Sequence, residues 1–213
     1  MNFNLPIILA TTNNHKDDSL VQSLINENDV LTYRGSENDV LKRFIKSAEK
    51  YKIDSIIRIC SDNPFLSVKF LHKLIESWEP GMDYLSFRLS DGTPSILTHY
   101  GFWAEMVSLK ALQKTNKLLD SSDKNREHVT SYIYKNPVLF NVNFIEIPEY
   151  IEKHKDIRLT LDTYNDFQLQ KDIYKELVDK NPNFDVEEVI EYLKKNEALL
   201  DKMKSEIKKN VKQ

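Results

Sequence analysis

The stretch Ser55-Ile-Ile-Arg-Ile-Cys60-Ser-Asp-Asn-Pro64 decides the fold, because a short apolar run ends there in polar residues and a proline. The run from Ser55 to Ile59 predicts a buried strand, and Ser67 to Trp78 carries apolar residues at helical spacing. A strand followed by a helix is the unit from which parallel sheets are built. This stretch therefore predicts an α/β fold.

The same alternation continues along the chain. Strands are expected at 5–9, 30–33, 82–87, 102–107, 138–147 and 157–161, and helices at 17–27, 39–50, 108–117, 126–135 and 165–179. Three strand–helix repeats without an obvious hairpin turn favour a three-layer αβα sandwich with a mixed, mostly parallel sheet.

The C-terminal segment differs from the rest. From Asp185 to Gln213 an apolar stripe runs among many Lys and Glu residues, which predicts helix. Such a stripe packs on its own domain or on a second subunit, so a homodimer is one expectation. We expect an α/β domain over residues 1–180 and a helical extension over 181–213.

Composition excludes several kinds of site. The 213 residues contain four glycines, too widely spaced for a dinucleotide fingerprint or a P-loop. With 30 Lys and Arg against 33 Asp and Glu, no basic field favours nucleic acid. The single cysteine, Cys60, is expected to be a buried strand thiol, and the five histidines lack metal-ligand spacing. No signal peptide or membrane span is apparent, so we expect a cytoplasmic protein without nucleic-acid or membrane partners.

Polar residues follow several of the expected strands. Ligands of open α/β sheets bind beyond the carboxyl ends of the strands, so these positions are the candidates for a site. They are Thr11-Thr12-Asn13, Arg34-Gly-Ser36, Ser61-Asp62-Asn63-Pro64, Glu105 and Asp162.

Asp62 and Asp162 are the sharpest of these candidates. Two carboxylates from two strands suit Mg²⁺, which keeps several waters and accepts one or two carboxylates together with substrate phosphates. Each carboxylate could instead cap the helix that follows it. Both interpretations remain open from the residues alone.

Arginine usage gives a second indication. Arg34, Arg58, Arg126 and Arg158 all lie in or beside the strand-end segments of a chain that otherwise prefers lysine. Arginine grips phosphate or carboxylate with two parallel hydrogen bonds, but internal ion pairs with the many acids explain the pattern equally well. No nucleophile elbow or Cys–His pair is present, which disfavours covalent hydrolysis.

Five stretches, in order, resemble the cytidylyltransferase family of GT-A-like nucleotidyltransferases, especially its spore-coat polysaccharide branch, which is related to acylneuraminate and KDO cytidylyltransferases. They cover nearly all of residues 5–178 and are Ile8-Leu-Ala-Thr-Thr-Asn13, Tyr33-Arg-Gly-Ser-Glu-Asn-Asp-Val-Leu-Lys-Arg43, Arg58-Ile-Cys-Ser-Asp-Asn-Pro64, Arg126-Glu-His-Val-Thr-Ser-Tyr-Ile-Tyr-Lys-Asn-Pro137 and Arg158-Leu-Thr-Leu-Asp-Thr163.

The resemblance implies a GT-A-like fold and attack by a sugar hydroxyl, expected on a sugar acid, on the α-phosphate of CTP. It assigns catalysis and Mg²⁺ binding to Asp62 and Asp162. Residues expected near the nucleotide are Thr11, Thr12, Asn13, Arg34, Ser36 and Asp39. Residues expected to bind the acceptor sugar are Asn63, Glu105, Arg126, Glu127, His128 and Arg158.

Two departures from the family pattern shape the alternatives. The family's first strand–loop–helix unit, with its glycine-bearing nucleotide loop, is expected to be missing from this chain, which would leave the chain inactive alone. Trp103 stands where the resemblance implies an acidic residue. The alternatives are a noncatalytic binding or assembly partner and a GT-A glycosyltransferase that uses a nucleotide-sugar donor.

Overall fold

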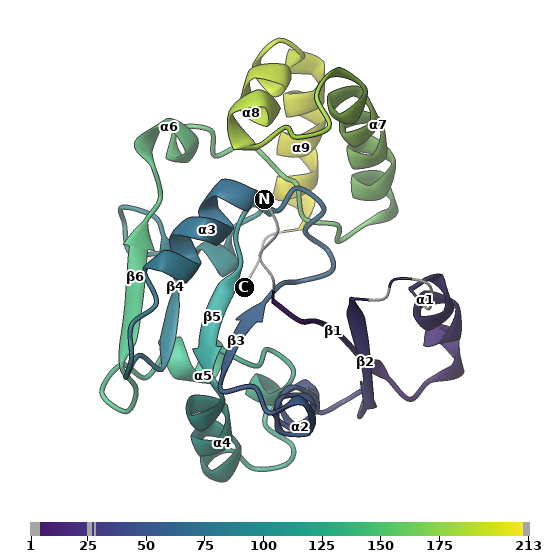
Figure 1. Cartoon of the computed structure of the whole chain (residues 1–213). Helices are drawn as coiled ribbons and strands as arrows, with labels where there is room; N and C mark the ends of the chain where they lie inside the picture. The colour runs from purple at the N-terminus through teal and green to yellow at the C-terminus, as the bar shows by residue number, and fades with distance from the viewer. Residues whose placement is uncertain (1–4, 25–26, 28, 211–213) are drawn as a thin grey trace. The chain divides into compact units, whose positions relative to one another are not determined.

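The computed structural model describes residues 5–24, 27 and 29–210 (Figure 1). The chain forms two compact units. Unit 1 consists of the residues up to Ile56 together with Val107–Val142, and unit 2 of Ile57–Met106 together with the residues from Asn143 onward.

Unit 1 contains a parallel pair of strands. Strand β1 (Ile7–Thr12) pairs with β2 (Val30–Gly35) in a register that runs from Ile7 opposite Val30 to Thr12 opposite Gly35. The connection holds a 3-10 turn, η1 (His15–Asp17), and helix α1 (Asp18–Ser23). The expected helix over 17–27 is therefore shorter than predicted, and its residues 25 and 26 lie outside the described residues.

Helix α2 (Val40–Tyr51) covers this strand pair and also contacts α4 (Leu109–Leu118). Both helices begin where the sequence predicts, because Asp39 and Ser108 accept hydrogen bonds from backbone N–H groups of the first turn.

The expected helix over 126–135 is wrong. The structure has a 3-10 turn, η3 (Lys124–Arg126), and a short helix, α5 (Ser131–Tyr134). Val129 separates them with φ of 55°, a left-handed conformation that a β-branched residue rarely adopts and that an α-helix cannot accommodate.

A four-stranded sheet has the order β3-β5-β4-β6, and Figure 1 shows these strands side by side. Unit 2 holds β4 (Tyr84–Arg88) whole and parts of β3 (Ser55–Arg58), β5 (Glu105–Ser108) and β6 (Val142–Glu146). Because β3 ends at Arg58, Cys60 is a half-buried loop residue, and its expected position inside a strand is wrong.

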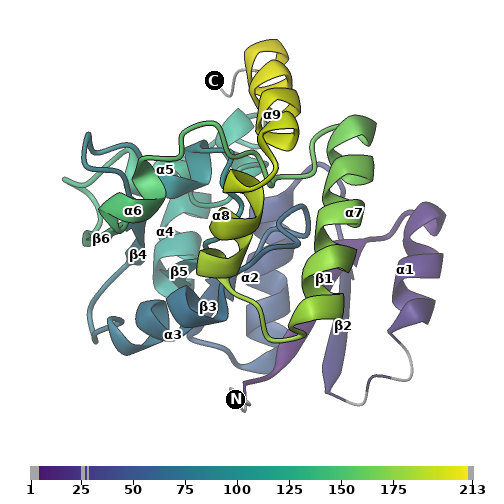
Figure 2. The same cartoon turned by 90° about the horizontal axis from the view of Figure 1, so that it is seen from above.

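Helices complete unit 2. Helix α3 (Val68–Glu76) packs Phe70 against Phe87 of β4, with ring centroids 5.5 Å apart. Helix α6 (Glu149–Glu152) is a single turn, whereas α7 (Tyr164–Lys180), α8 (Val186–Lys194) and α9 (Glu197–Lys209) lie side by side in Figures 1 and 2.

The C-terminal helices join the same core as the sheet. Val189, Leu193 and Met203 belong to the hydrophobic cluster that contains Phe70 and Phe87. The single helix expected from 185 onward is wrong, because a new helix begins after Asn196, and Gln213 lies outside the described residues. The division of the chain at residue 180 remains a prediction.

The expected strand over 157–161 is also wrong. Residues 157–160 are buried, and the segment bonds singly to other parts of the chain, as from Leu159 N–H to the His99 carbonyl at 2.7 Å and from Leu161 N–H to the Asp62 carbonyl at 2.8 Å. It passes so close to Gly101 that a Cβ at that position would lie 2.5 Å from the Leu159 carbonyl oxygen. Glycine at 101 therefore permits the approach.

The α/β fold class is confirmed, with parallel strand pairing observed in β1 and β2.

Candidate functional site

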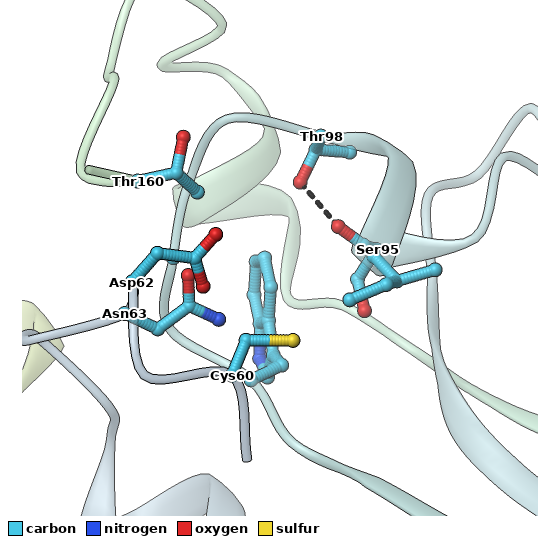
Figure 3. Close-up of a pocket in the computed structure, with 9 residues that line it drawn as sticks. Cys60, Asp62, Asn63, Ser95, Thr98 and Thr160 are labelled. Atoms are coloured by element: carbon cyan, nitrogen blue, oxygen red, sulfur yellow. Dashed lines mark hydrogen bonds between the residues drawn. The ribbon is translucent and has the colours of Figure 1, made fainter. Parts of the chain in front are cut away.

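A small recess lies in unit 2 beyond the end of β3. It encloses about 30 Å³, enough for one or two water-sized groups. In Figure 3, Asp62 and Asn63 reach into it from the loop after β3, and Ser95 and Thr98 face them from a neighbouring segment. The complete lining is Cys60, Asp62, Asn63, Ser95, Ile96, Thr98, Gly101, Trp103 and Thr160.

Two lining residues have buried polar atoms without hydrogen-bond partners in the described part of the chain. They are Oδ1 of Asp62 and Nε1 of Trp103. Only 5% of the surface of Trp103 is exposed. A buried polar atom without a partner costs about 1–3 kcal/mol, and most such atoms in folded proteins are satisfied. Two of the residues that line the recess therefore carry a buried polar atom whose hydrogen-bonding capacity is unused in the described part of the chain.

The backbone fixes the position of Asp62. Its carbonyl accepts from Leu161 N–H, and Asn63 N–H donates to the Cys60 carbonyl at 3.1 Å. These bonds place the loop after β3 against the buried 157–161 segment. Asp62 therefore lies beside the residue that precedes Asp162 in the chain.

The Asp162 carboxylate is held by neighbouring side chains. Its Oδ2 atom accepts from Thr160 Oγ1 at 2.7 Å and lies 3.0 Å from Arg158 Nη2. Arg158 is fully buried and also grips Asp166 with two hydrogen bonds of 2.8 Å. Its position favours a role in holding Asp162 and Asp166 rather than direct contact with a sugar.

This network changes the pKa of its acid. Burial alone would raise the pKa of the Asp166 carboxyl, but the hydrogen bonds and charge of Arg158 outweigh burial and hold that pKa below its usual range. Asp166 also closes the capping box of α7 with Thr163. The residues that cap α7 are therefore Thr163 and Asp166, and not Asp162.

Glu105, which is not among the residues that line the recess, occupies a second buried ion pair. Its Oε2 atom lies 2.5 Å from Arg58 Nη1, and its other oxygen accepts from the Tyr84 hydroxyl. Burial lowers the pKa of the Arg58 guanidinium, but the Glu105 charge more than offsets this and raises it. Glu105 is thus the internal counter-ion of Arg58.

In unit 1, the expected nucleotide residues of β1 bind an acid of their own unit. The hydroxyls of Thr11 and Thr12 each donate to Asp17 Oδ2 at 2.6 Å, and Thr12 N–H donates to the same oxygen at 3.0 Å. These bonds lower the pKa of Asp17 to about 2. Asn13 extends the strand pairing, with its N–H donating to the Gly35 carbonyl at 3.0 Å.

The remaining expected nucleotide residues are also engaged. Arg34 Nη2 lies 2.5 Å from Asp18 Oδ1, and the Ser36 hydroxyl accepts from Asp39 N–H at 3.1 Å. Asp39 caps α2 with one oxygen and accepts from Arg126 Nη2 at 2.8 Å with the other.

The 126–128 stretch divides between interior and surface. Arg126 is buried and donates to Asp39 and, at 2.6 Å, to Asn116 Oδ1. Glu127 and His128 are exposed. Their expected role at the acceptor sugar remains a prediction.

The structure thus brings Asp62 and Asn63 together in one recess, and the backbone carries Asp162 next to it. Sequence reasoning did not identify Ser95, Thr98 or Thr160 as lining residues, since nothing in their local pattern marks them. The Gly101 to Trp103 stretch carried the available signal, because glycine permits close backbone approach and an indole inside an apolar run needs a hydrogen-bond partner.

The fit of a metal ion can be judged from the same atoms. In residues 5–24, 27 and 29–210, no group of three or more His, Cys, Asp or Glu side chains could hold a metal. Mg²⁺ does not require such a group, because it takes one or two carboxylates plus substrate phosphates. The unpartnered Asp62 oxygen fits that arrangement.

Comparison with known proteins gives consistent relatives. The sequence profile described as cytidylyltransferase matches residues 2–207. The chain is 40% identical to an uncharacterized protein of Methanocaldococcus jannaschii over 194 residues, covering 89% of this chain and 73% of that protein. It is 32% identical to the spore coat polysaccharide biosynthesis protein SpsF of Bacillus subtilis over 191 residues, covering 89% of this chain and 75% of that protein.

Solved structures agree on the fold. A cytidylyltransferase from Leptospira borgpetersenii superposes with a TM-score of 0.74 at 24% identity, covering 91% of this chain and 77% of that one. The 4-diphosphocytidyl-2C-methyl-D-erythritol synthase of Anaerococcus prevotii superposes with a TM-score of 0.50 at 10% identity, covering 80% and 78% of the two chains.

Among the described residues, no helix is both long enough and apolar enough to cross a membrane.

Proposed function

Because the chain belongs to the cytidylyltransferase family, we propose that it transfers CMP from CTP to a sugar, expected to be a sugar acid, in surface polysaccharide or nonulosonate biosynthesis. The observation that carries this proposal is the buried, unpartnered Asp62 oxygen in a polar recess at the end of β3. This is where ligands of α/β sheets bind.

In the proposed reaction a hydroxyl oxygen of the sugar bonds to the α-phosphorus of CTP and gives up its proton to solvent water. The bond from that phosphorus to the bridging oxygen breaks, and pyrophosphate leaves. Such a transfer depends on positioning and on neutralising charge rather than on a protein nucleophile. None of the residues that line the recess is cationic, so the neutralising charge would come from a metal ion held by Asp62.

Asp62 and Asp162 would hold Mg²⁺, which supplies charge neutralisation on the phosphates when bound. Arg158 and Thr160 orient Asp162 through their bonds to its Oδ2 atom. The loop that carries Asp62 is held by the bond from Leu161 N–H to the Asp62 backbone carbonyl. The chain's own contribution is therefore to fix two carboxylates on adjoining segments.

The test measures pyrophosphate release from CTP with Mg²⁺ and a panel of acceptors. The panel includes N-acetylneuraminate, 3-deoxy-manno-octulosonate, mannose and N-acetylglucosamine, with ATP, GTP and UTP as nucleotide controls. Release that requires both CTP and one acceptor supports the proposal. Silence with every acceptor, also from a version of the chain to which the family's first strand–loop–helix unit has been added, overturns it. Hydrolysis of UDP- or GDP-sugars without any response to CTP would support a glycosyltransferase instead.

A further inference from the structure

The loop that follows β3 carries Asp62 and continues to the start of α3. Near its beginning the loop is held by the bond from Leu161 N–H to the Asp62 carbonyl, at 2.8 Å. Farther along, Phe65 and Ser67 are both buried, with exposed fractions of 3% and 2%. The contacts of these two side chains therefore decide how the rest of the loop is held.

Both side chains contact the two residues that precede α8. The Phe65 ring lies 6.1 Å from the Phe184 ring, centroid to centroid. The Ser67 hydroxyl donates to Asp185 Oδ1 at 2.5 Å, and Lys69 N–H donates to Asp185 Oδ2 at 3.0 Å. Phe184 and Asp185, which we call the α8 clamp, thus hold the loop and the start of α3 through one apolar and two polar contacts.

The Asp185 carboxylate serves the starts of two helices. Its Oδ1 atom also accepts from the N–H of Val186, the first residue of α8, at 2.7 Å, and Lys69 lies in the first turn of α3. A negative charge at a helix N-terminus is favoured by the helix dipole. Asp185 N–H donates to Glu188 Oε2 at 3.1 Å, which completes a capping box. Asp185 is therefore fixed to α8, whose apolar residues lie in the core of unit 2.

Ser67 also ties the loop to a second segment of the recess wall. Its N–H donates to the Phe102 carbonyl at 2.9 Å. The neighbours of Phe102 on both sides, Gly101 and Trp103, line the recess, as Asp62 does from the loop itself. The residue that Asp185 holds is thus a link between two lining segments.

Resting on the proposed function, we infer that Asp185 is a positioning residue, which together with Phe184 keeps the loop after β3 in the place where the Asp62 carboxylate meets Mg²⁺. Asp185 is not among the residues that line the recess, so it acts through Ser67 and the loop. Removing such an outer partner of a metal-binding group typically costs about 10- to 100-fold in metal affinity or activity.

The first test is kinetic and uses the full chain. D185S keeps a residue type that caps helices well, but its single side-chain oxygen cannot serve α8, Ser67 and Lys69 together. The Mg²⁺ concentration for half-maximal pyrophosphate release should rise about 10-fold in D185S, because the Asp62 carboxylate is held less firmly. E188A is the matched control: it weakens the same cap of α8 but leaves the bonds from Ser67 and Lys69 to Asp185 in place, so its Mg²⁺ requirement should stay that of the wild type.

Hydrogen exchange measured by NMR, without metal or substrate, reports on the loop directly. Leu161 N–H donates to the loop, whereas Ile147 N–H donates to the Arg88 carbonyl at 2.9 Å and reports opening elsewhere in unit 2. D185S should speed the exchange of Leu161 N–H about 10-fold more than that of Ile147 N–H. E188A should change the two rates alike.

Two kinetic results would overturn the inference: a Mg²⁺ requirement that D185S leaves at the wild-type value, or one that E188A raises as much as D185S does. An unchanged ratio of the Leu161 and Ile147 exchange rates in D185S would also overturn it. If no acceptor releases pyrophosphate, the exchange rates alone decide. A selectively faster Leu161 N–H then leaves the α8 clamp standing while the proposed transfer fails, and an unchanged ratio refutes the clamp.

Discussion

Two strand ends, that of β1 in unit 1 and that of β3 in unit 2, differ in how their polar side chains are engaged. In unit 1, the hydroxyls of Thr11 and Thr12 after β1 both donate to Asp17. In unit 2, Asp62 keeps a buried carboxylate oxygen without a hydrogen-bond partner in the described residues. A polar residue at a strand end is therefore no evidence of a ligand site by itself. A buried polar atom without a hydrogen-bond partner is a better indicator of a ligand site when its residue also lines a recess, as Asp62 does.

Replacing Asp62 should produce the largest effect. D62N keeps the shape of the side chain but removes its charge, so kcat/KM for pyrophosphate release should fall by about 10³-fold. The free energy of unfolding should stay the same or rise slightly, because the carboxylate oxygen has no stabilising partner to lose.

The matched control is D172N, which changes an exposed acid on α7 of the same unit. It should leave both activity and thermal unfolding unchanged. An active D62N variant, or one that unfolds several degrees below the wild type, would place Asp62 among the structural polar residues typical of unit 1.

The Arg158 network gives the next largest effect, this time on stability. D166N leaves the fully buried guanidinium without its two-bond partner, which should cost about 3–5 kcal/mol of unfolding free energy in urea. D162N removes an acid whose side chain is 34% exposed, so it should cost about 1 kcal/mol or less. If D166N and D162N lost the same unfolding free energy, Asp162 and Asp166 would contribute equally to stabilising the buried Arg158 guanidinium.

Sequence reasoning predicted most of the fold and only part of the site. Helix starts were well marked because capping side chains such as Asp39, Ser67 and Ser108 are local signals. The sequence of the 157–161 segment predicts a strand that the structure does not have, because its apolar pattern reflects burial between other elements rather than sheet pairing. Local pattern cannot distinguish these two causes.

The site was harder to predict because partners come from distant residues. Arg34, Arg126 and Arg158 all have the strand-end position expected of ligand-binding arginines, and each pairs with an acid of its own unit. Asp18 lies 16 residues from Arg34, and Asp39 lies 87 residues from Arg126. Which of two interpretations holds for an arginine thus depends on tertiary contacts that no local spacing reveals.

Two arginines of unit 1 sharpen the comparison further. R126M removes a buried guanidinium that bonds Asp39 and Asn116, so it should cost about 2–3 kcal/mol of unfolding free energy. R34M breaks a partly exposed pair with Asp18 and should cost less than about 1 kcal/mol. Urea unfolding of both variants measures the difference.

The same R34M variant tests the expected role of Arg34 in nucleotide binding. Because its fold should be nearly as stable as the wild type, a rise in the KM for CTP would report a lost nucleotide contact rather than unfolding. An unchanged KM for CTP would leave Arg34 with the Asp18 ion pair as its role.

The smallest expected effect concerns Asp17, the clearest case of an acid satisfied within its own unit. Bonds from Thr11 and Thr12 lower its pKa to about 2 from an ordinary value of 3.8. A folded pKa below the unfolded one means that the stabilising contribution is complete above about pH 3.8 and is lost as the pH falls through about 2. The wild type should therefore keep this contribution at pH 4 and lose it between pH 4 and 2, whereas D17N should show no such step.

A carboxyl NMR titration of Asp17 should give a midpoint near 2, and T12V should move that midpoint upward because one of the two threonine hydroxyl donors is removed. A wild-type midpoint near 3.8 would show that the threonine hydroxyls are not committed to Asp17 and are available to a ligand, which would bring the strand ends of unit 1 closer to the behaviour of Asp62.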